Sequence, residues 1–206
     1  MDELAQRWQE VHRSKFEDVS WWQNPEDIWL DLFLDLDLAS TAQIVDVGAG
    51  ASLVIDCLSG EGFVNLSALD ISDSAIERLR VRTGEIFPPV HFIVANVLNF
   101  EANQRFDVWH DRAVFHFLTS ESEQTQYLES LLRNLKPDGI FILATFALDG
   151  PDQCSGLPVA RHNLASLLQV FGQHFEVVDS GSRIHRTPWG SIQPFTIARF
   201  RRRPAT

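Results

Sequence analysis

Short apolar runs alternate with amphipathic segments along most of the chain. Five of these runs have the length and composition of strands: QIVDVGAG, VNLSALDI, VHFIVANV, RFDVWHD and GIFILATF. Strands that alternate with helical segments in this way are typical of a parallel sheet covered by helices. Two later runs, HFEVVDSG and PFTIARF, are expected to form a closing pair of strands. The pattern therefore predicts an α/β fold.

Helix signals lie between these runs. Ahead of AIERLRVR, Ser72, Asp73 and Ser74 are candidate caps, and Ser74 and Glu77 have the spacing of a capping box. Ser120 and Glu123 have the same spacing further along. Behind the second box, leucines and Tyr127 repeat at helical spacing until LKPDG ends the helix and leads into the fifth strand. RHNLASLLQVF predicts a further helix.

The N-terminal region predicts two helices. ELAQRWQEVHR is the first. The alternation of Leu and Asp in DIWLDLFLDLDL resembles a strand, but Asn24 followed by Pro25 is a strong helix start. Large apolar side chains would then share one helical face: Trp29, Leu32, Phe33 and Leu36. We therefore expect a helix here as well.

Composition fits one domain spanning residues 1–206. The 206 residues are 45 % hydrophobic, and we find no internal repeat and no long Pro/Gly linker. Lys and Arg total 17 and Asp and Glu total 28, which gives a net charge of −11 with neutral histidines. Such acidity disfavours broad contact with nucleic acid or a polybasic membrane patch.

Features of the chain favour a cytoplasmic protein, as a monomer or a homodimer. The N-terminal residues lack an apolar signal core, and no apolar run approaches the roughly 20 residues of a membrane span. Two cysteines, Cys57 and Cys154, cannot by themselves form a disulfide framework or a four-thiolate metal site. No spacing of cysteines and histidines supports a zinc site, so we expect no metal.

The first apolar run ends in a glycine-rich loop. Its sequence, VDVGAGAS, contains Asp46, Gly48, Gly50 and Ser52. Glycines allow the backbone to approach a ligand closely, and the N-terminus of the following helix offers free N–H groups. A dinucleotide-binding fingerprint would place glycine or alanine three residues after Gly50, where Leu53 stands. The glycine pair alone is also compatible with an ordinary turn between a strand and a helix.

Polar residues at the ends of the next two runs make the pattern more specific. Asp70 ends the second run, where a carboxylate can bind two ribose hydroxyls. Asn96 and Val97 end the third run, where an amide and an apolar side chain can meet the edge and the face of a purine. Each residue is ordinary by itself, but their joint order along one α/β chain is informative.

With these motifs, residues 40–200 resemble the class I S-adenosylmethionine-dependent methyltransferases. The first-strand motif of that family reads acid-x-Gly-x-Gly-x-Gly, and here Ser52 stands in place of the last glycine. The resemblance implies a Rossmann-like, seven-stranded, mostly parallel sheet with helices on both faces and a C-terminal antiparallel hairpin. It implies S-adenosylmethionine as cofactor, with S-adenosylhomocysteine as product, bound by a core of residues 40–206. Residues 1–39 would form an N-terminal helical lid.

The same resemblance assigns roles to individual residues. The loop of residues 48–50, with Asp46 and Ser52 beside it, would hold the methionine part of the cofactor. Asp70 would bind its ribose, while Ile71 and Val97 would enclose its adenine. Asn96 stands where the family often has an aspartate.

The end of the fourth run is the candidate acceptor side. His110, Asp111, Arg112 and His116 follow one another closely in DVWHDRAVFHFLT. This segment resembles the D-R-[AG] segment of thiopurine-type and related small-molecule methyltransferases, and the D-K-G segment of some protein-lysine methyltransferases. His110 or Asp111 could act as general base if the acceptor carries a proton. Alternatively, Asp111 pairs with Arg112 or caps neighbouring backbone, and His116 packs in the core instead of contacting substrate.

Two more segments are candidates to contact the substrate. Trp21 and Trp22 precede the first strand, where many methyltransferases place a lid, and aromatic rings can shield a sulfonium. The same two rings could instead pack as a hydrophobic staple for the next helix. A long polar loop after the fifth strand ends at Arg161, and loops of that length are often functional.

These observations predict a methyltransferase that moves the methyl group of S-adenosylmethionine directly, in line, to sulfur, nitrogen or oxygen of a small molecule. A protein-lysine methyltransferase, with a protein substrate, is the nearest alternative and requires an open groove beside the fourth and fifth strands. A non-catalytic nucleotide-binding scaffold is the second alternative, and failure to bind the cofactor would favour it.

Overall fold

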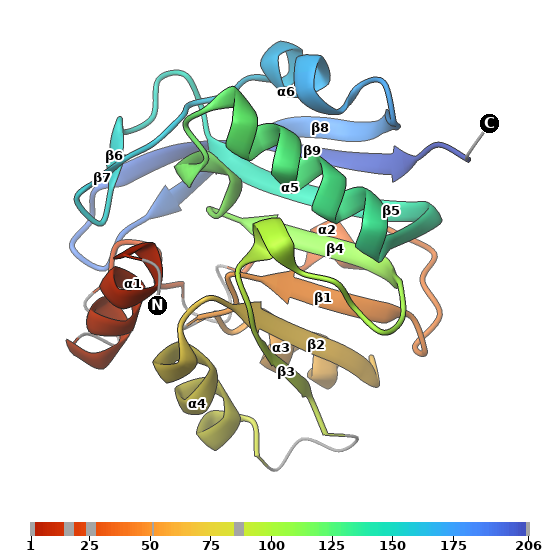
Figure 1. Ribbon diagram of the computed structural model, residues 1–206, viewed down its shortest axis with the longest axis horizontal. Coiled ribbons are helices and arrows are strands. Elements are labelled where there is room, and N and C mark those ends of the chain that lie inside the picture. Colours follow the sequence, from red (N-terminus) through yellow and green to blue (C-terminus); the bar gives the residue numbers. More distant parts are fainter. Residues whose placement is uncertain (1–2, 15–18, 24–27, 51, 85–88, 205–206) are drawn as a thin grey trace.

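A seven-stranded sheet with helices on both faces forms the centre of the structure (Figure 1). The computed structural model describes residues 3–14, 19–23, 28–50, 52–84 and 89–204. The strands of the sheet are β1 (Gln43–Val47), β2 (Asn65–Asp70), β3 (His91–Val94), β4 (Phe106–Arg112), β5 (Leu135–Phe146), β8 (Phe175–Arg186) and β9 (Ile192–Arg202). Their spatial order is β3-β2-β1-β4-β5-β9-β8. The expected fold class is confirmed.

One strand of the sheet, β9, runs against the direction of the other six. The pairs from β3 through β5 are parallel, whereas β9 runs antiparallel to both β5 and β8. The order reverses at β1, which lies between β2 and β4. In open α/β sheets, ligands bind beyond the carboxyl ends of the strands at such a switch point. The topology therefore points to the loops after β1, β2 and β4.

The helices divide between the two faces. They are α1 (Glu3–Ser14), α2 (Asp31–Leu34), α3 (Val54–Gly60), α4 (Asp73–Arg82), α5 (Glu121–Asn134) and α6 (Leu164–Phe171). Apolar side chains of α2, α3 and α4 pack with one face of the sheet, and those of α5 and α6 pack with the other. β4 contributes Val108 to the first core and Trp109 to the second, because successive side chains of a strand point to opposite faces.

The second core is rich in phenylalanine. Phe141, Phe171, Phe175 and Phe200 are fully buried, and neighbouring ring centroids lie 5.1 to 6.3 Å apart. Most of these pairs are tilted or edge-to-face, as the quadrupole of an aromatic ring favours. The packing ties α6 to the C-terminal strand pair and to β5.

Two local predictions need correction. The N-cap of α4 is Ser72, whose hydroxyl accepts from the Ala75 N–H at 3.2 Å, because the Ser74 hydroxyl instead donates to the Gln9 carbonyl oxygen of α1. The helix expected over residues 29–36 is the short α2, and Asp35 already ends it. The predicted start at residues 24–25 lies outside the described residues.

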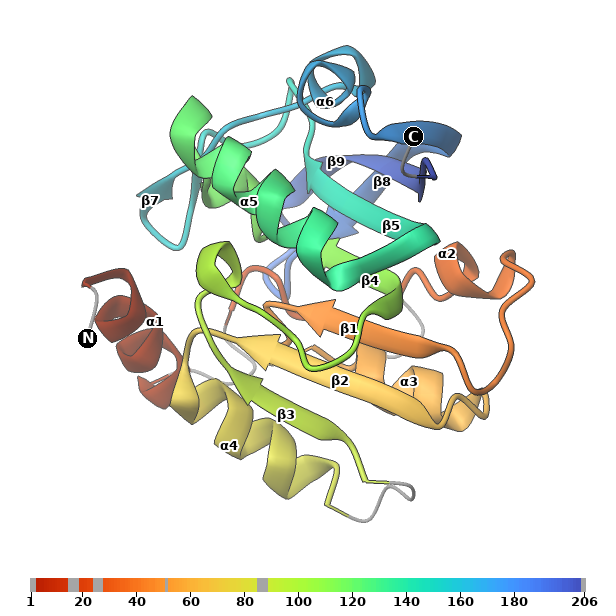
Figure 2. The same cartoon turned by 45° about the vertical axis from the view of Figure 1, so that its right-hand side comes forward.

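The polar loop after β5 is partly ordered as a hairpin. Two short strands, β6 (Gln153–Cys154) and β7 (Leu157–Pro158), pair antiparallel within it. A single-turn 3-10 helix, η2 (Val97–Asn99), follows β3, and another, η3 (Phe115–Phe117), follows β4. Figures 1 and 2 show the β6–β7 hairpin and α1 at the end of the sheet to which the arrowheads of β1 and β2 point.

The capping box of α5 gives a test of local stability. The Ser120 hydroxyl accepts from the Glu123 N–H at 3.2 Å, and Glu123 accepts from the Ser120 N–H at 3.1 Å, as predicted. We expect Ser120→Ala to lower the free energy of unfolding by about 1 kcal/mol, because one N–H of the first turn loses its partner. Urea denaturation measures the change. Ser122→Ala, in the same turn, is the control and should change stability by less than about 0.5 kcal/mol.

Candidate active site

A cavity of about 200 Å³ opens at the carboxyl ends of β1, β2 and β4. Its wall includes eight residues that the sequence singled out for cofactor binding: Asp46, Gly48, Gly50, Ser52, Asp70, Ile71, Asn96 and Val97. These residues come from three separate segments of the chain, around residues 46–52, 70–71 and 96–97. The switch point of the sheet brings them together.

The glycine loop has a backbone that other residues would not adopt without strain. Gly48 has a φ of +68°, and a Cβ at this position would lie 2.2 Å from Cγ2 of Val114. Gly50 has a φ of +35°, and a Cβ there would lie 3.0 Å from the His12 ring. Left-handed backbone and lack of space both require glycine. The Gly48 N–H donates to the Leu69 carbonyl oxygen at 2.7 Å, which fixes the loop against the end of β2.

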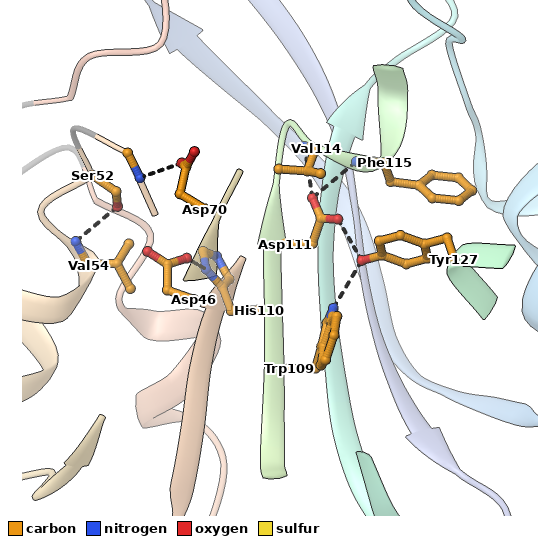
Figure 3. A network of polar contacts seen from close by, with 11 residues as sticks. Asp46, Ser52, Val54, Asp70, Trp109, His110, Asp111, Val114, Phe115 and Tyr127 are labelled. Carbon is orange, nitrogen blue, oxygen red and sulfur yellow. Dashed lines mark hydrogen bonds and ion pairs between the residues drawn. The ribbon is translucent and has the colours of Figure 1, made fainter. Parts of the chain in front are cut away.

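Asp70 holds the loop from the other side (Figure 3). Its carboxylate accepts from the Gly50 N–H at 2.9 Å and from the Ser72 N–H at 2.8 Å. Burial raises the pKa of Asp70 to about 6, although these backbone hydrogen bonds oppose the rise. Ile71 and Val97 add apolar surface nearby, and the Asn96 side chain accepts from the Leu98 N–H at 3.0 Å, which caps η2.

Asp46 forms a buried pair with the neighbouring strand. His110 lies opposite Asp46 in the register of β1 and β4, and its Nδ1 is 2.7 Å from Oδ1 of Asp46. The other oxygen, Oδ2, is buried without a hydrogen-bond partner. A buried polar atom without a partner is costly, and Asp46 lines the cavity, so a bound hydrogen-bond donor or cation would satisfy it.

Asp111 is enclosed on the opposite face of β4. Figure 3 shows its carboxylate between Tyr127 of α5 and the loop after β4. The Tyr127 hydroxyl donates to it at 2.5 Å, and the N–H groups of Val114 and Phe115 donate at 2.9 and 3.3 Å. The indole N–H of Trp109 in turn donates to the Tyr127 hydroxyl at 3.0 Å. Burial raises the pKa of Asp111 to about 6.

Comparison with known proteins identifies the family of the chain. Residues 38–180 match the model of a family described as a methyltransferase domain. The chain belongs to this family. The resemblance of residues 40–200 to class I S-adenosylmethionine-dependent methyltransferases is thus confirmed, and with it the expected cofactor.

Individual relatives give the same picture. The methyltransferase domain is 28 % identical over 125 residues to a ubiquinone biosynthesis O-methyltransferase of Rickettsia canadensis, covering 61 % of this chain and 51 % of the relative. It is 27 % identical over 149 residues to EEF1A lysine methyltransferase 2 of Danio rerio, covering 69 % of this chain and 58 % of that one. The chain therefore spans only a little over half the length of these relatives.

A solved structure extends the likeness of fold to nearly the whole chain. The crystal structure of a SAM-dependent methyltransferase from Anabaena variabilis superposes with a TM-score of 0.76 at 17 % sequence identity. The alignment covers 98 % of this chain and 96 % of that one. It includes the region of α1 and α2, which lies before the residues matched by the family model.

The cavity of the methyltransferase domain fits S-adenosylmethionine. The unpartnered Oδ2 of Asp46 would accept from the ammonium of the cofactor, and the backbone of the glycine loop leaves room that a Cβ would fill. Asp70 adds a second carboxylate to the wall, and Ile71 and Val97 add apolar surface. An acidic and apolar wall suits a ligand that carries a sulfonium and an ammonium.

Neither proposed general base lines the cavity. His110 is buried between Asp46 and the ring of Phe33, whose centroid lies 5.0 Å away. Asp111 caps backbone N–H groups, as one of its alternative interpretations held. The structure therefore does not support their placement on the acceptor side, and their role as general bases stays a prediction.

The other acceptor-side candidates separate into two groups. Arg112 and Trp21 line the cavity, and Nη1 of Arg112 donates to the Trp21 carbonyl oxygen at 3.0 Å. Trp22, His116 and Arg161 do not line it. The expected contacts of these three residues with substrate are therefore not supported.

The two polar members of the second group contact other parts of the protein. His116 packs in the core between the rings of Phe117 and Phe146, at 4.4 and 4.5 Å. Burial lowers the pKa of His116 to about 3, so the ring is neutral at pH 7. Arg161 donates to the Gly150 carbonyl oxygen at 3.2 Å. Both side chains therefore contact other residues of the protein and not the cavity.

The sequence did not single out two residues of α1 that line the cavity. Trp8 and His12 lie one turn apart, and their rings pack with that of Trp21 at 5.8 and 6.0 Å. Their spacing of four residues places them on one helical face, a signal that the sequence contained. The sequence did not indicate which strand ends this face of the helix would cover. Gln9 makes the placement definite, because its side-chain oxygen accepts from the Ser74 N–H at 3.1 Å at the start of α4.

Two further features concern the part of the chain that the structure describes. No group of three or more histidine, cysteine or acidic side chains there is arranged to hold a metal ion. No helix within the same residues is long and apolar enough to cross a membrane.

The Asp111 network predicts a structural phenotype. Tyr127→Phe removes the hydroxyl that donates to Asp111 and accepts from Trp109, so the free energy of unfolding should fall by about 1–3 kcal/mol. Urea denaturation measures this loss, and calorimetric titration with S-adenosylhomocysteine should give a dissociation constant within twofold of wild type. Unchanged stability together with a weakened cofactor complex would contradict a purely structural role for the network.

Proposed function

We propose that this chain transfers the methyl group of S-adenosylmethionine to sulfur, nitrogen or oxygen of a small molecule. The observation that carries the proposal is the cavity itself. It joins the glycine loop, the free oxygen of Asp46 and the carboxylate of Asp70 at the switch point of the sheet. Membership in the methyltransferase family gives the class of reaction.

In this proposal, the residues of the chain bind the cofactor and orient the methyl acceptor. Asp46 would hold the ammonium end of the cofactor, and Asp70 would hold the ribose through its two oxygens. When bound, S-adenosylmethionine supplies a methyl group attached to a sulfonium. A lone pair of the acceptor would bond to the methyl carbon, and the electron pair of the broken carbon–sulfur bond would stay on sulfur. Since His110 and Asp111 do not line the cavity, the rate enhancement is assigned to alignment of the acceptor and exclusion of water.

The N-terminal segment supports an enclosed acceptor site. Trp8 and His12 of α1, with Trp21, form one wall of the cavity. Figure 2 shows α1 beside α4, across the carboxyl ends of β1 and β2. We therefore assign α1 and Trp21 as a lid over the cofactor-binding core of residues 40–206, in a single methyltransferase domain, whereas α2 packs against the sheet. An enclosed site excludes water and favours a small acceptor over a large one.

A protein-lysine methyltransferase is the second candidate. The similarity to EEF1A lysine methyltransferase 2 favours it. The aromatic wall formed by Trp8 and Trp21 counts against it, because a peptide needs an open groove beside β4 and β5. Turnover of free small molecules in the absence of any protein substrate separates the two functions.

Calorimetric titration with S-adenosylmethionine and S-adenosylhomocysteine tests the proposal directly. We expect micromolar binding of both, which corresponds to roughly −8 kcal/mol. Asp70→Asn should weaken binding at least about tenfold, because the ribose loses a charged hydrogen-bond acceptor. Asp138→Asn, an equal charge change at an exposed position near the start of β5, is the control. Absence of binding by the wild-type chain would support a non-catalytic scaffold instead.

The raised pKa of Asp70 predicts a pH dependence of cofactor affinity. A carboxyl with a pKa of about 6 is ionised at pH 7.5 and mostly protonated at pH 5. Ribose hydroxyls donate best to the ionised form, so the dissociation constant of S-adenosylhomocysteine should rise as the pH falls through 6, by up to about tenfold at pH 5. In Asp70→Asn this rise should be lost. An equally steep profile in the variant would assign the effect to another group.

A further inference from the structure

Arg112 is a half-buried cation, and the two nitrogens of its best hydrogen-bonding edge are buried and free. It is the last residue of β4 and forms part of the cavity wall. Nη1 donates to the Trp21 carbonyl oxygen at 3.0 Å, whereas Nε and Nη2 are buried without a partner. No carboxylate of the described residues lies within ion-pair distance of it. Buried charges are normally paired, so these two nitrogens lack a partner that a bound molecule could supply.

The guanidinium is held in a fixed plane. The rings of Trp29 and Phe195 lie with their centroids 5.4 and 5.6 Å from its central carbon. Together with the bond to Trp21, these contacts determine which edge stays free. Nε and Nη2 lie on the same edge of a guanidinium, and two parallel N–H groups of this kind match the two oxygens of a carboxylate.

The charges around the cavity leave one place for an anion. Its other charged lining residues are Asp46, Asp70 and Glu123. Among the lining residues that the structure describes, Arg112 is the one lysine or arginine. Burial lowers the pKa of Arg112 to about 10, so the group is still charged at pH 7 and gains from a counterion.

We propose that the methyl acceptor carries a carboxylate, and that the Nε/Nη2 edge of Arg112 binds it. This inference rests on the proposed function and names the class of its substrate: a small carboxylic acid with a nucleophilic sulfur, nitrogen or oxygen. Arg112 would thus determine specificity through binding. The carboxylate of the cofactor's own methionine part has the same chemistry, so the experiment must distinguish the two sources.

The first experiment compares matched acceptors on the wild-type protein. Thiols, amines and phenols are each supplied as a carboxylic acid and as the corresponding carboxamide, and release of S-adenosylhomocysteine is measured. We expect kcat/KM to be at least about tenfold higher for the acids, because the amide cannot form the charged bidentate contact. The same pairs are titrated into protein saturated with S-adenosylhomocysteine. A panel in which no acid reacts or binds better than its amide overturns the inference.

The second experiment identifies Arg112 as the source of the preference. Arg112→Gln should abolish the preference mainly through KM, and Arg112→Lys should restore part of it because the charge returns without the planar fork. Arg80→Gln, an exposed arginine of α4, is the control. The dissociation constant of S-adenosylhomocysteine should stay within twofold of wild type in each variant.

The outcomes separate the two proposals. A tenfold weaker complex of Arg112→Gln with S-adenosylhomocysteine, with the acid preference intact, would assign the free edge to the cofactor carboxylate and overturn the inference. Failure of the wild-type protein to bind S-adenosylhomocysteine would overturn the proposed function itself. If Arg112→Gln does not fold, the wild-type comparison of acids with amides decides the question alone.

Discussion

A single buried carboxylate joins three parts of the site. Asp70 accepts hydrogen bonds from Gly50 in the loop after β1 and from Ser72 at the start of α4. The loop can come this close because Gly48 and Gly50 lack a Cβ. The start of α4 in turn binds Gln9 of α1. The wall of the cavity, including the part formed by α1, therefore depends on the carboxylate of Asp70 at the end of β2.

Three carboxylates near the switch point differ because their partners differ. Asp111 has both oxygens bonded and is enclosed by α5, so it stabilises the loop after β4. Asp46 has one oxygen bonded to His110 and one without a partner, so it can serve a ligand. Asp70 is also bonded by backbone, yet it lines the cavity. Burial alone does not distinguish a structural acid from a binding one, whereas access to the cavity does.

The predictions made from the sequence succeeded where the signal was local. The glycine loop, Asp70 and the Asn96–Val97 pair follow strand ends, and parallel strands place their carboxyl ends together. The Ser120 capping box needs only four consecutive residues. The Ser74 box failed because a distant residue, Gln9, takes part in the local hydrogen bonding. The sequence did not show that His110 and Asp111 lie inside β4, before its end.

The sequence by itself determined the α/β class, which strand each motif residue follows along the chain, and which loop is the candidate for cofactor binding. Periodicity and glycine requirements act over a few residues, so they can be read along the chain. Only the tertiary structure decided that α1 covers the cavity and that Arg112 lies between Trp29 and Phe195 with one edge free. Those features depend on contacts between segments more than 60 residues apart, and packing of this kind leaves no periodic trace in the sequence.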